Sequence, residues 1–193
     1  MFSRIFSDSI SGQSFGKPVG IADVAWNGCC WSVKTVKQKL PHSVRKIRLI
    51  SGRNSPVYSS GINNPFHDIA ATGESVLSIY NKRIETAGWD HDDKRLLVLI
   101  RNMQANEYTM FERPIVQLVP NNYQWRENSK RNLEGYEGEK HMFTWQPHGS
   151  QFTIIETVPA GAVRFRIKKA PLTLELRHVL NLVRYKADWV KII

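Results

Sequence analysis

The chain has 193 residues, of which 41% are hydrophobic and 10% aromatic. These values are typical of a single globular domain over residues 1–193, and they exclude an intrinsically disordered chain. No run of about 18 apolar residues occurs, so we expect no membrane span, and the N-terminus lacks the pattern of a signal peptide. The only two cysteines, Cys29 and Cys30, are adjacent and without a zinc-binding motif, which favours a reducing cytoplasm.

The net charge of +10 is unevenly distributed. Residues 1–53 contain nine Lys and Arg against two acids, and residues 164–193 contain eight against two. Residues 68–112 contain five against eight, so both ends are basic and the middle is mildly acidic. A basic surface of this kind attracts polyanions, with nucleic acid as the first expectation and a membrane surface as the second.

The first dozen residues are expected to form a short helix or an irregular start. A β-hairpin follows, because Asn27–Gly28 lies between two β-prone runs and favours a type I′ turn, in which both central residues have positive φ. A two-residue loop at this position pairs Trp26 with Cys29 and Val24 with Trp31. The hairpin therefore has a defined register.

The next strand is predicted over residues 46–50, before a turn-rich loop that ends near Pro65. Residues 72–87 have apolar positions at helical spacing, with Thr72 suited to the N-cap and Gly88 to the position after the helix. The apolar run 95–100 is typical of a strand buried on both faces. Further elements are predicted as strands near 108–111, 115–119, 141–145, 151–158 and 163–168, and as a last helix over 172–185. The expected fold class is α+β, or mixed α/β, with a mostly β second half.

Side chains alternate between the faces of a strand, so the hairpin register places Asp23, Ser32 and Lys34 on the face opposite Val24. An acid, a hydroxyl and an amine on one face indicate a site for a metal ion and a phosphate. The alternative is an ordinary cross-strand ion pair between Asp23 and Lys34. Lys37 is the alternative to Lys34 as the lysine of this site, but it falls on the Val24 face unless a bulge in the hairpin changes the register.

This arrangement resembles the core of the PD-(D/E)xK nuclease superfamily, whose best-known members are type II restriction endonucleases. The resemblance covers roughly residues 15–101. It implies that Asp23 ligates Mg²⁺ and that Lys34 orients or activates the attacking water and steadies the phosphate. Ser32 stands where most members have Asp or Glu, and some members then take the second carboxylate from a neighbouring helix. Glu74, in the first turn of the predicted helix, is the candidate for that role and for a second metal ligand.

Two further groups of residues are candidates for DNA contact. The segment 143–151 joins two predicted strands and contains groups that can bind base edges or phosphates. Basic and polar residues after the hairpin are placed to contact phosphates. The candidates are Arg45, Arg48, Arg53, Asn54, Gln146, His148 and Gln151. The alternatives are a structural hairpin loop with exposed polar tips and a solvated basic edge.

The function expected from the resemblance is a Mg²⁺-dependent endonuclease that hydrolyses duplex DNA, of the type II restriction class. A homodimer would cut both strands, and the part of the chain over residues 102–193 would recognise the DNA. Two other interpretations stay open: a non-catalytic DNA-binding module that keeps the fold, and an RNA-acting or repair nuclease of the same fold.

Overall fold

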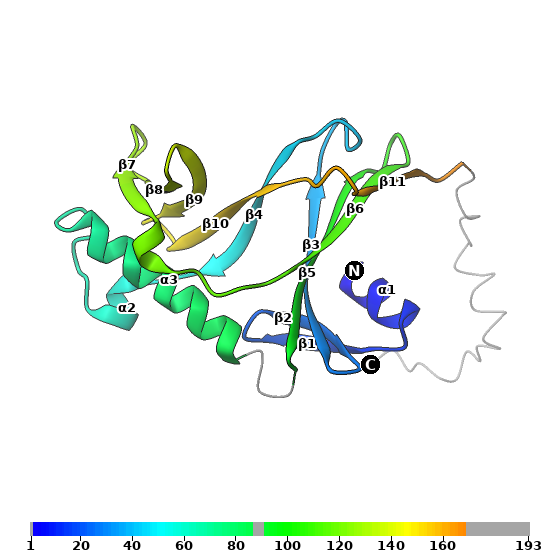
Figure 1. Ribbon diagram of the computed structural model, residues 1–193, viewed down its shortest axis with the longest axis horizontal. Coiled ribbons are helices and arrows are strands. Elements are labelled where there is room, and N and C mark those ends of the chain that lie inside the picture. Colours follow the sequence, from blue (N-terminus) through cyan, green and yellow to red (C-terminus); the bar gives the residue numbers. More distant parts are fainter. Residues whose placement is uncertain (1, 87–90, 169–193) are drawn as a thin grey trace, which may run out of the picture.

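The computed structural model describes residues 2–86 and 91–168, which form an α+β fold with two β-sheets (Figure 1). Sheet A contains, in spatial order, β1 (Gln13–Val19), β2 (Ala22–Trp26), β3 (Cys29–Lys37), β5 (Asp93–Asn102), β6 (Glu107–Pro114) and β11 (Val163–Arg166). Sheet B contains β4 (Lys46–Arg53), β10 (Gln151–Thr157), β9 (Lys140–Gln146), β8 (Leu133–Glu137) and β7 (Gln124–Glu127). The helices are α1 (Phe2–Ser9), α2 (Pro56–Ser60), α3 (Ile69–Thr86) and the short 3-10 helix η1 (Pro120–Asn122).

The predicted hairpin and its register are confirmed. The β2–β3 ladder pairs Trp26 with Cys29 and Val24 with Trp31. Both turn residues of Asn27–Gly28 have positive φ, at 45° and 75°, as a type I′ turn requires. The sequence therefore determines locally which side chains of β2 and β3 share a face.

Strand β5 is the parallel neighbour of β3, and its residues 96–100 are buried, as the apolar run predicts. Other neighbouring strands of the two sheets run antiparallel. A parallel pair needs a crossover connection. Here the connection includes β4, α2 and α3, and β4 joins the other sheet rather than extending sheet A.

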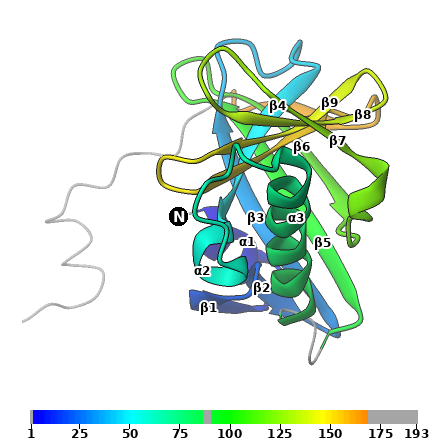
Figure 2. The same cartoon turned by 90° about the vertical axis from the view of Figure 1, so that its left-hand side faces the viewer.

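Helices cover both faces of the hairpin. Helix α1 packs Phe6 against Trp31 on the Val24 face, with ring centroids 5.4 Å apart. On the other face, α3 contributes Val76, Leu77, Tyr80 and Ile84 to a cluster that includes Ala25 and Cys30 of the hairpin and aromatic side chains of sheet B. Figure 2 shows α3 lying over β3 and β5, with β7, β8 and β9 across one end of it. The helix is thus held between the hairpin and sheet B.

The bounds of α3 differ from the prediction, because the helix begins at Ile69 rather than after Thr72. The Asp68 carboxylate accepts a hydrogen bond from the Ala71 N–H at 2.9 Å and so provides the cap expected from Thr72. The Thr72 hydroxyl is buried and donates to the carbonyls of Pro65 and Asp68. Glu74 consequently lies one turn further into the helix than expected.

Other predicted elements agree in part. Strands near 108–111, 141–145, 151–158 and 163–168 are confirmed as β6, β9, β10 and β11. The strand predicted over 115–119 is wrong: the side chain of Asn81 bonds both the N–H and the carbonyl of Leu118, so this segment pairs with α3 instead of a strand. The sequence prediction missed β1, β7, β8 and α2. The helix predicted over 172–185 lies outside the described residues.

Candidate active site at the divergence of two strands

Asp23 lies where β2 and β3 separate. The backbone ladder ends at the pair Val24 and Trp31, so the expected backbone pairing of Asp23 with Ser32 is absent. Instead, the Asp23 Oδ2 atom accepts a hydrogen bond of 2.7 Å from the N–H of Val33. The carboxylate replaces a backbone carbonyl as the partner of this N–H, which fixes the position of Asp23 beside β3.

Lys34 lies next to this carboxylate. Its Nζ atom is 4.0 Å from Asp23 Oδ2, and the two side chains are 30% and 21% exposed. Burial lowers the pKa of Lys34 from its ordinary 10.5, the Asp23 charge acts in the opposite direction, and the nearby Arg83 lowers it further. A lysine of this kind is easier to deprotonate than a surface lysine.

Lys34 and Ser32 also line a narrow pocket between sheet A, sheet B and α3. About 20 Å³ of this pocket is open to the centres of water molecules, which is room for one or two waters. Ser32 is 4% exposed. Lys34 therefore lies between the Asp23 carboxylate and a small pocket lined by both polar and apolar side chains.

Arg83 of α3 lines the same pocket, and sequence reasoning missed it. Its Nη1 atom donates to the carbonyl of Ser51 and, at 3.5 Å, to Oδ1 of Asn54. Burial lowers the pKa of Arg83, whereas the charges of Tyr80 and Asp23 act to raise it. A basic residue in the last turn of a helix is favoured by the helix dipole alone, so the sequence contained no specific signal for this role.

A β-bulge presents the Ser51 carbonyl to Arg83. The β4–β10 register pairs Gly52 with Phe152 and Ile50 with Thr153, so Ser51 is the extra residue on β4. Gly52 has φ +113°, and a Cβ atom there would lie 2.5 Å from Arg83 Nη1. This backbone conformation favours glycine, and a side chain at this position would displace the Arg83 guanidinium.

An ion pair closes the pocket on the other side. Arg113 of β6 and Ser32 of β3 are both paired with Leu96 of β5, so the three residues lie in one row. The Arg113 Nε atom donates to Glu156 Oε2 at 2.9 Å, and its Nη2 bonds Oε1. The Glu156 side chain is 10% exposed, and its carboxylate is occupied by this two-point contact.

Glu74 does not lie in this pocket. It is exposed and lines a different surface depression with Trp125 of β7. Glu74 and Arg83 are nine residues apart, which is two and a half helical turns, so they project from opposite sides of α3. The structure therefore does not bring Glu74 to the pocket beside Asp23, and the expected second carboxylate is not in place there.

The donor set for a metal ion is correspondingly small. Within residues 2–86 and 91–168, no group of three or more His, Cys, Asp or Glu side chains is arranged to hold a metal ion. Asp23 is the carboxylate at the divergence of β2 and β3. Mg²⁺ can be held by one or two carboxylates together with substrate phosphates, so Asp23 fits a metal that arrives with its phosphate substrate.

Asn54 is not available for DNA contact. Its side chain is fully buried, and its Nδ2 atom donates to the carbonyl of Val76 at 2.8 Å. Its backbone carbonyl accepts from the indole N–H of Trp145 at 2.8 Å. The expectation for Asn54 is therefore wrong, and the residue instead ties the end of β4 to α3 and β9.

The other candidates for DNA contact do not form one cluster. Arg45 precedes β4 and Arg53 ends it, and eight residues of extended strand separate them by about 26 Å. Arg48 lies between them and donates to the Thr144 hydroxyl at 2.8 Å. The structure therefore distributes these arginines along the strand rather than around one point.

The remaining candidates do gather at one end of sheet B. Gln151 is paired with Arg53 on one side and with Gln146 on the other. His148 is exposed in the tight turn between β9 and β10. The predicted polar loop thus exists, and the register brings Arg53 beside it.

Among the described helices, none is long and apolar enough to cross a membrane. Comparison of the chain with protein-family models, with curated proteins and with solved structures found no match.

Proposed function

We propose that this protein is a Mg²⁺-dependent endonuclease that hydrolyses phosphodiester bonds in duplex DNA. The observation that carries this proposal is the placement of Lys34 Nζ 4.0 Å from Asp23 Oδ2 where β2 and β3 separate. The net charge of +10 supports a polyanionic substrate. The Asp23 strand, the hairpin to the Lys34 strand, the helix α3 and the buried strand β5 follow one another as in the resemblance, whereas the intervening strand β4 lies in the other sheet.

Each side chain has a role in this mechanism. Asp23 would hold the metal ion, which when bound makes hydroxide available and offsets the charge of the scissile phosphate. Lys34, whose pKa is lowered by burial, would accept the proton of the attacking water. Ser32 would hydrogen-bond a phosphate oxygen or a water in the pocket, and the Arg83 guanidinium would supply positive charge beside it.

The proposal also covers assembly and recognition. A homodimer would place one such site on each strand of the duplex. The end of sheet B that carries Arg53, Gln146, His148 and Gln151 is the proposed surface for contact with DNA bases and phosphates. The recognised sequence would be set by this surface rather than by Lys34 and Asp23.

Incubation of the purified protein with plasmid and phage DNA tests the proposal. Cleavage is expected in Mg²⁺ and not in EDTA, and Asp23→Asn is expected to abolish it while leaving thermal stability close to that of the wild type. The products should have defined ends, which sequencing of the termini would reveal. Cleavage in EDTA, or cleavage by Asp23→Asn at the wild-type rate, would contradict the proposal.

A second candidate is a non-catalytic DNA-binding module with the same fold. The small donor set favours it, because Ser32 replaces an acid and Glu74 lies on another surface. This candidate predicts salt-sensitive binding of duplex DNA without cleavage, and binding that Mg²⁺ and Asp23→Asn leave unchanged. Parallel cleavage and binding assays distinguish the two candidates.

A further inference from the structure

A basic groove lies at the end of sheet A where the parallel strands β3 and β5 both finish. Its volume is about 590 Å³, and its lining includes Lys37, Lys39, Arg101, Asn102 and Gln104. Lys37 and Lys39 are exposed, and the groove is lined by no acidic residue. The polar side chains that line the groove are therefore either basic or amides.

The charges in this groove lack a counter-charge. Lys37 and Arg101 are direct partners in the parallel ladder, so like-charged residues stand opposite each other on strands whose backbones are about 4.8 Å apart. In the part of the chain that the structure describes, no carboxylate lies within ion-pair distance of Lys37, Lys39 or Arg101. The Arg101 Nε atom is buried without a hydrogen-bond partner, and Nη1 contacts only the thioether of Met103. Like charges directly opposite each other are destabilising, and an anion bound between them would offset this repulsion.

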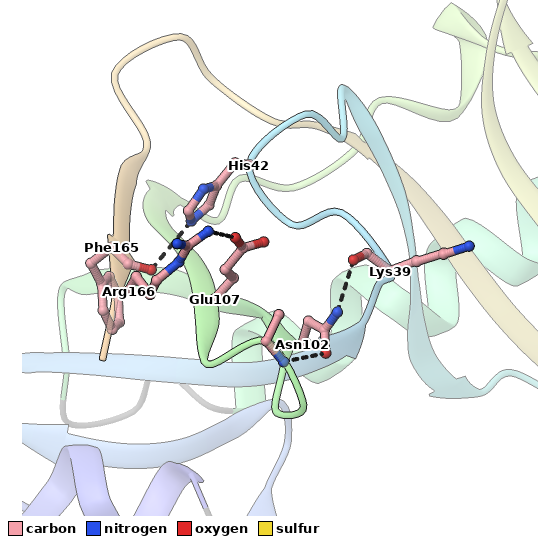
Figure 3. A network of polar contacts seen from close by, with 7 residues as sticks. Lys39, His42, Asn102, Glu107, Phe165 and Arg166 are labelled. Atoms are coloured by element: carbon pink, nitrogen blue, oxygen red, sulfur yellow. Dashed lines mark hydrogen bonds and ion pairs between the residues drawn. The ribbon is translucent and has the colours of Figure 1, made fainter. Parts of the chain in front are cut away.

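The backbone around the groove is held by side-chain hydrogen bonds. Asn102 Nδ2 donates to the carbonyl of Lys39 at 2.9 Å, and Asn102 Oδ1 accepts from the N–H groups of Gln104 and Ala105. Figure 3 shows this link, with the Lys39 side chain extending away from it. The nearby Glu107 is bonded to Arg166 and so does not neutralise the groove. These hydrogen bonds hold the backbone of Lys39 and of the turn after β5 in place beside the groove.

We propose that this groove binds backbone phosphates of duplex DNA. Lys37 is three residues from Lys34, so the two side chains project from opposite faces of β3. The groove is therefore a second contact surface, separate from the candidate active site, and it would hold a different stretch of duplex. It rests on the proposed function for the identity of the polyanion, and the basic residues of the groove without a carboxylate partner support the binding of an anion.

The salt dependence of DNA binding tests this proposal in EDTA, where no cleavage is needed. Fluorescence anisotropy with a labelled duplex gives the slope of log K against log salt for the wild type and for Lys37→Gln/Lys39→Gln/Arg101→Gln. Each lost phosphate contact lowers the slope by about 0.9, so the triple variant is expected to lose about 2.7. The matched control is Arg4→Gln/Lys82→Gln/Lys140→Gln, which removes the same charge from exposed positions elsewhere and should retain a steeper slope.

A second readout uses the unliganded protein. The groove variant removes an unfavourable juxtaposition of like charges, so its melting temperature at low salt should equal or exceed that of the wild type. A lower melting temperature would show that the charges are not in conflict and would count against the bound anion. Equal slopes for the groove and control variants, or a groove-dependent preference for duplex RNA over duplex DNA, would overturn the proposal.

The proposal can fail independently of the endonuclease. If the groove variant shows the weaker salt dependence of DNA binding and keeps the wild-type cleavage rate at saturating DNA, the groove and the active site are separate. If Asp23→Asn cleaves as the wild type does while the groove variant still loses the slope, the endonuclease proposal fails and the groove stands. If the groove variant binds as the control does while Asp23→Asn is inactive, the groove proposal alone fails.

Discussion

Gly52 and Arg83 occupy the same small space at the edge of the pocket, because a Cβ atom at Gly52 would lie 2.5 Å from Arg83 Nη1. We predict that Gly52→Ala lowers the free energy of unfolding by about 1–3 kcal/mol, the usual cost of a strained backbone at positive φ. It should also displace the Arg83 guanidinium and slow DNA cleavage. Chemical denaturation and cleavage kinetics on the same preparation measure both effects.

Gly61→Ala is the matched control for this substitution. Gly61 also has positive φ, at 68°, but a Cβ atom there would meet nothing within 4 Å. Its replacement should cost stability through backbone strain and leave cleavage unchanged. Equal losses of cleavage in both variants would show that Arg83 has no role beyond stability.

The buried amine of Lys34 should make stability depend on pH. Burial holds its pKa below 10.5 in the folded protein, so the unfolded chain binds more protons between the folded pKa and 10.5. Stability therefore rises with pH across this window. We predict that the free energy of unfolding of the wild type increases relative to Lys34→Met as pH rises toward 10.5.

Denaturation of both proteins over a series of pH values checks this prediction. Lys82→Met, at an exposed position of α3, is the control for loss of a lysine charge. If the unfolding free energy of the wild type minus that of Lys34→Met stays constant or falls as pH rises, Lys34 is better solvated than the structure indicates.

We expect Asn54 to stabilise the fold rather than to contact DNA. Asn54→Ala removes the buried hydrogen bond to the Val76 carbonyl, which costs about 0.5–1.5 kcal/mol. The exposed Asn63 is the control, because substitution to alanine there should change stability by less than about 0.5 kcal/mol. Loss of DNA affinity by Asn54→Ala at unchanged stability would restore the residue as a contact.

The reactivity of the Cys29 thiol reports on how well α1 covers the hairpin. Burial, and secondarily the Asp93 charge, raises its pKa from 9.0 to about 11. Its thiolate fraction at neutral pH is therefore about 100-fold lower than that of an ordinary thiol, and alkylation by iodoacetamide should slow in proportion. Mass spectrometry of a labelling time course measures the rate at Cys29, and labelling at the rate of a free peptide thiol would contradict this environment.

The sequence predicted best where structure is set by neighbouring residues. Asn27–Gly28 fixed the hairpin register, which is why Asp23, Ser32 and Lys34 could be placed on one face before the fold was known. The buried strand over 95–100 was equally clear, since a short and continuous apolar run favours a strand that is covered on both faces.

The parts that could not be predicted depend on contacts between distant segments. Arg83 enters the pocket because a bulge at Ser51 on β4 turns a carbonyl toward α3, and bulges have no reliable sequence signal. Asn54 is buried because β9 and α3 close over it. For Glu74, a shift of the helix start and the rotation of α3 decided which surface it faces, and neither follows from periodicity alone.

We expect Asp23 and Lys34 to be required for DNA cleavage and Glu74 to be dispensable. One measurement tests this difference most directly. It is the rate at which supercoiled plasmid DNA is cleaved in Mg²⁺ by the wild type and by Asp23→Asn, Lys34→Met, Glu74→Gln and Lys82→Met. We predict that Asp23→Asn and Lys34→Met each reduce the rate by about 100-fold or more, the usual effect of losing a general acid–base group or its metal partner. Glu74→Gln and Lys82→Met should cleave as the wild type does. Cleavage by Lys34→Met at the wild-type rate, or no cleavage by the wild type itself, would contradict the assignment of the active site to the divergence of β2 and β3.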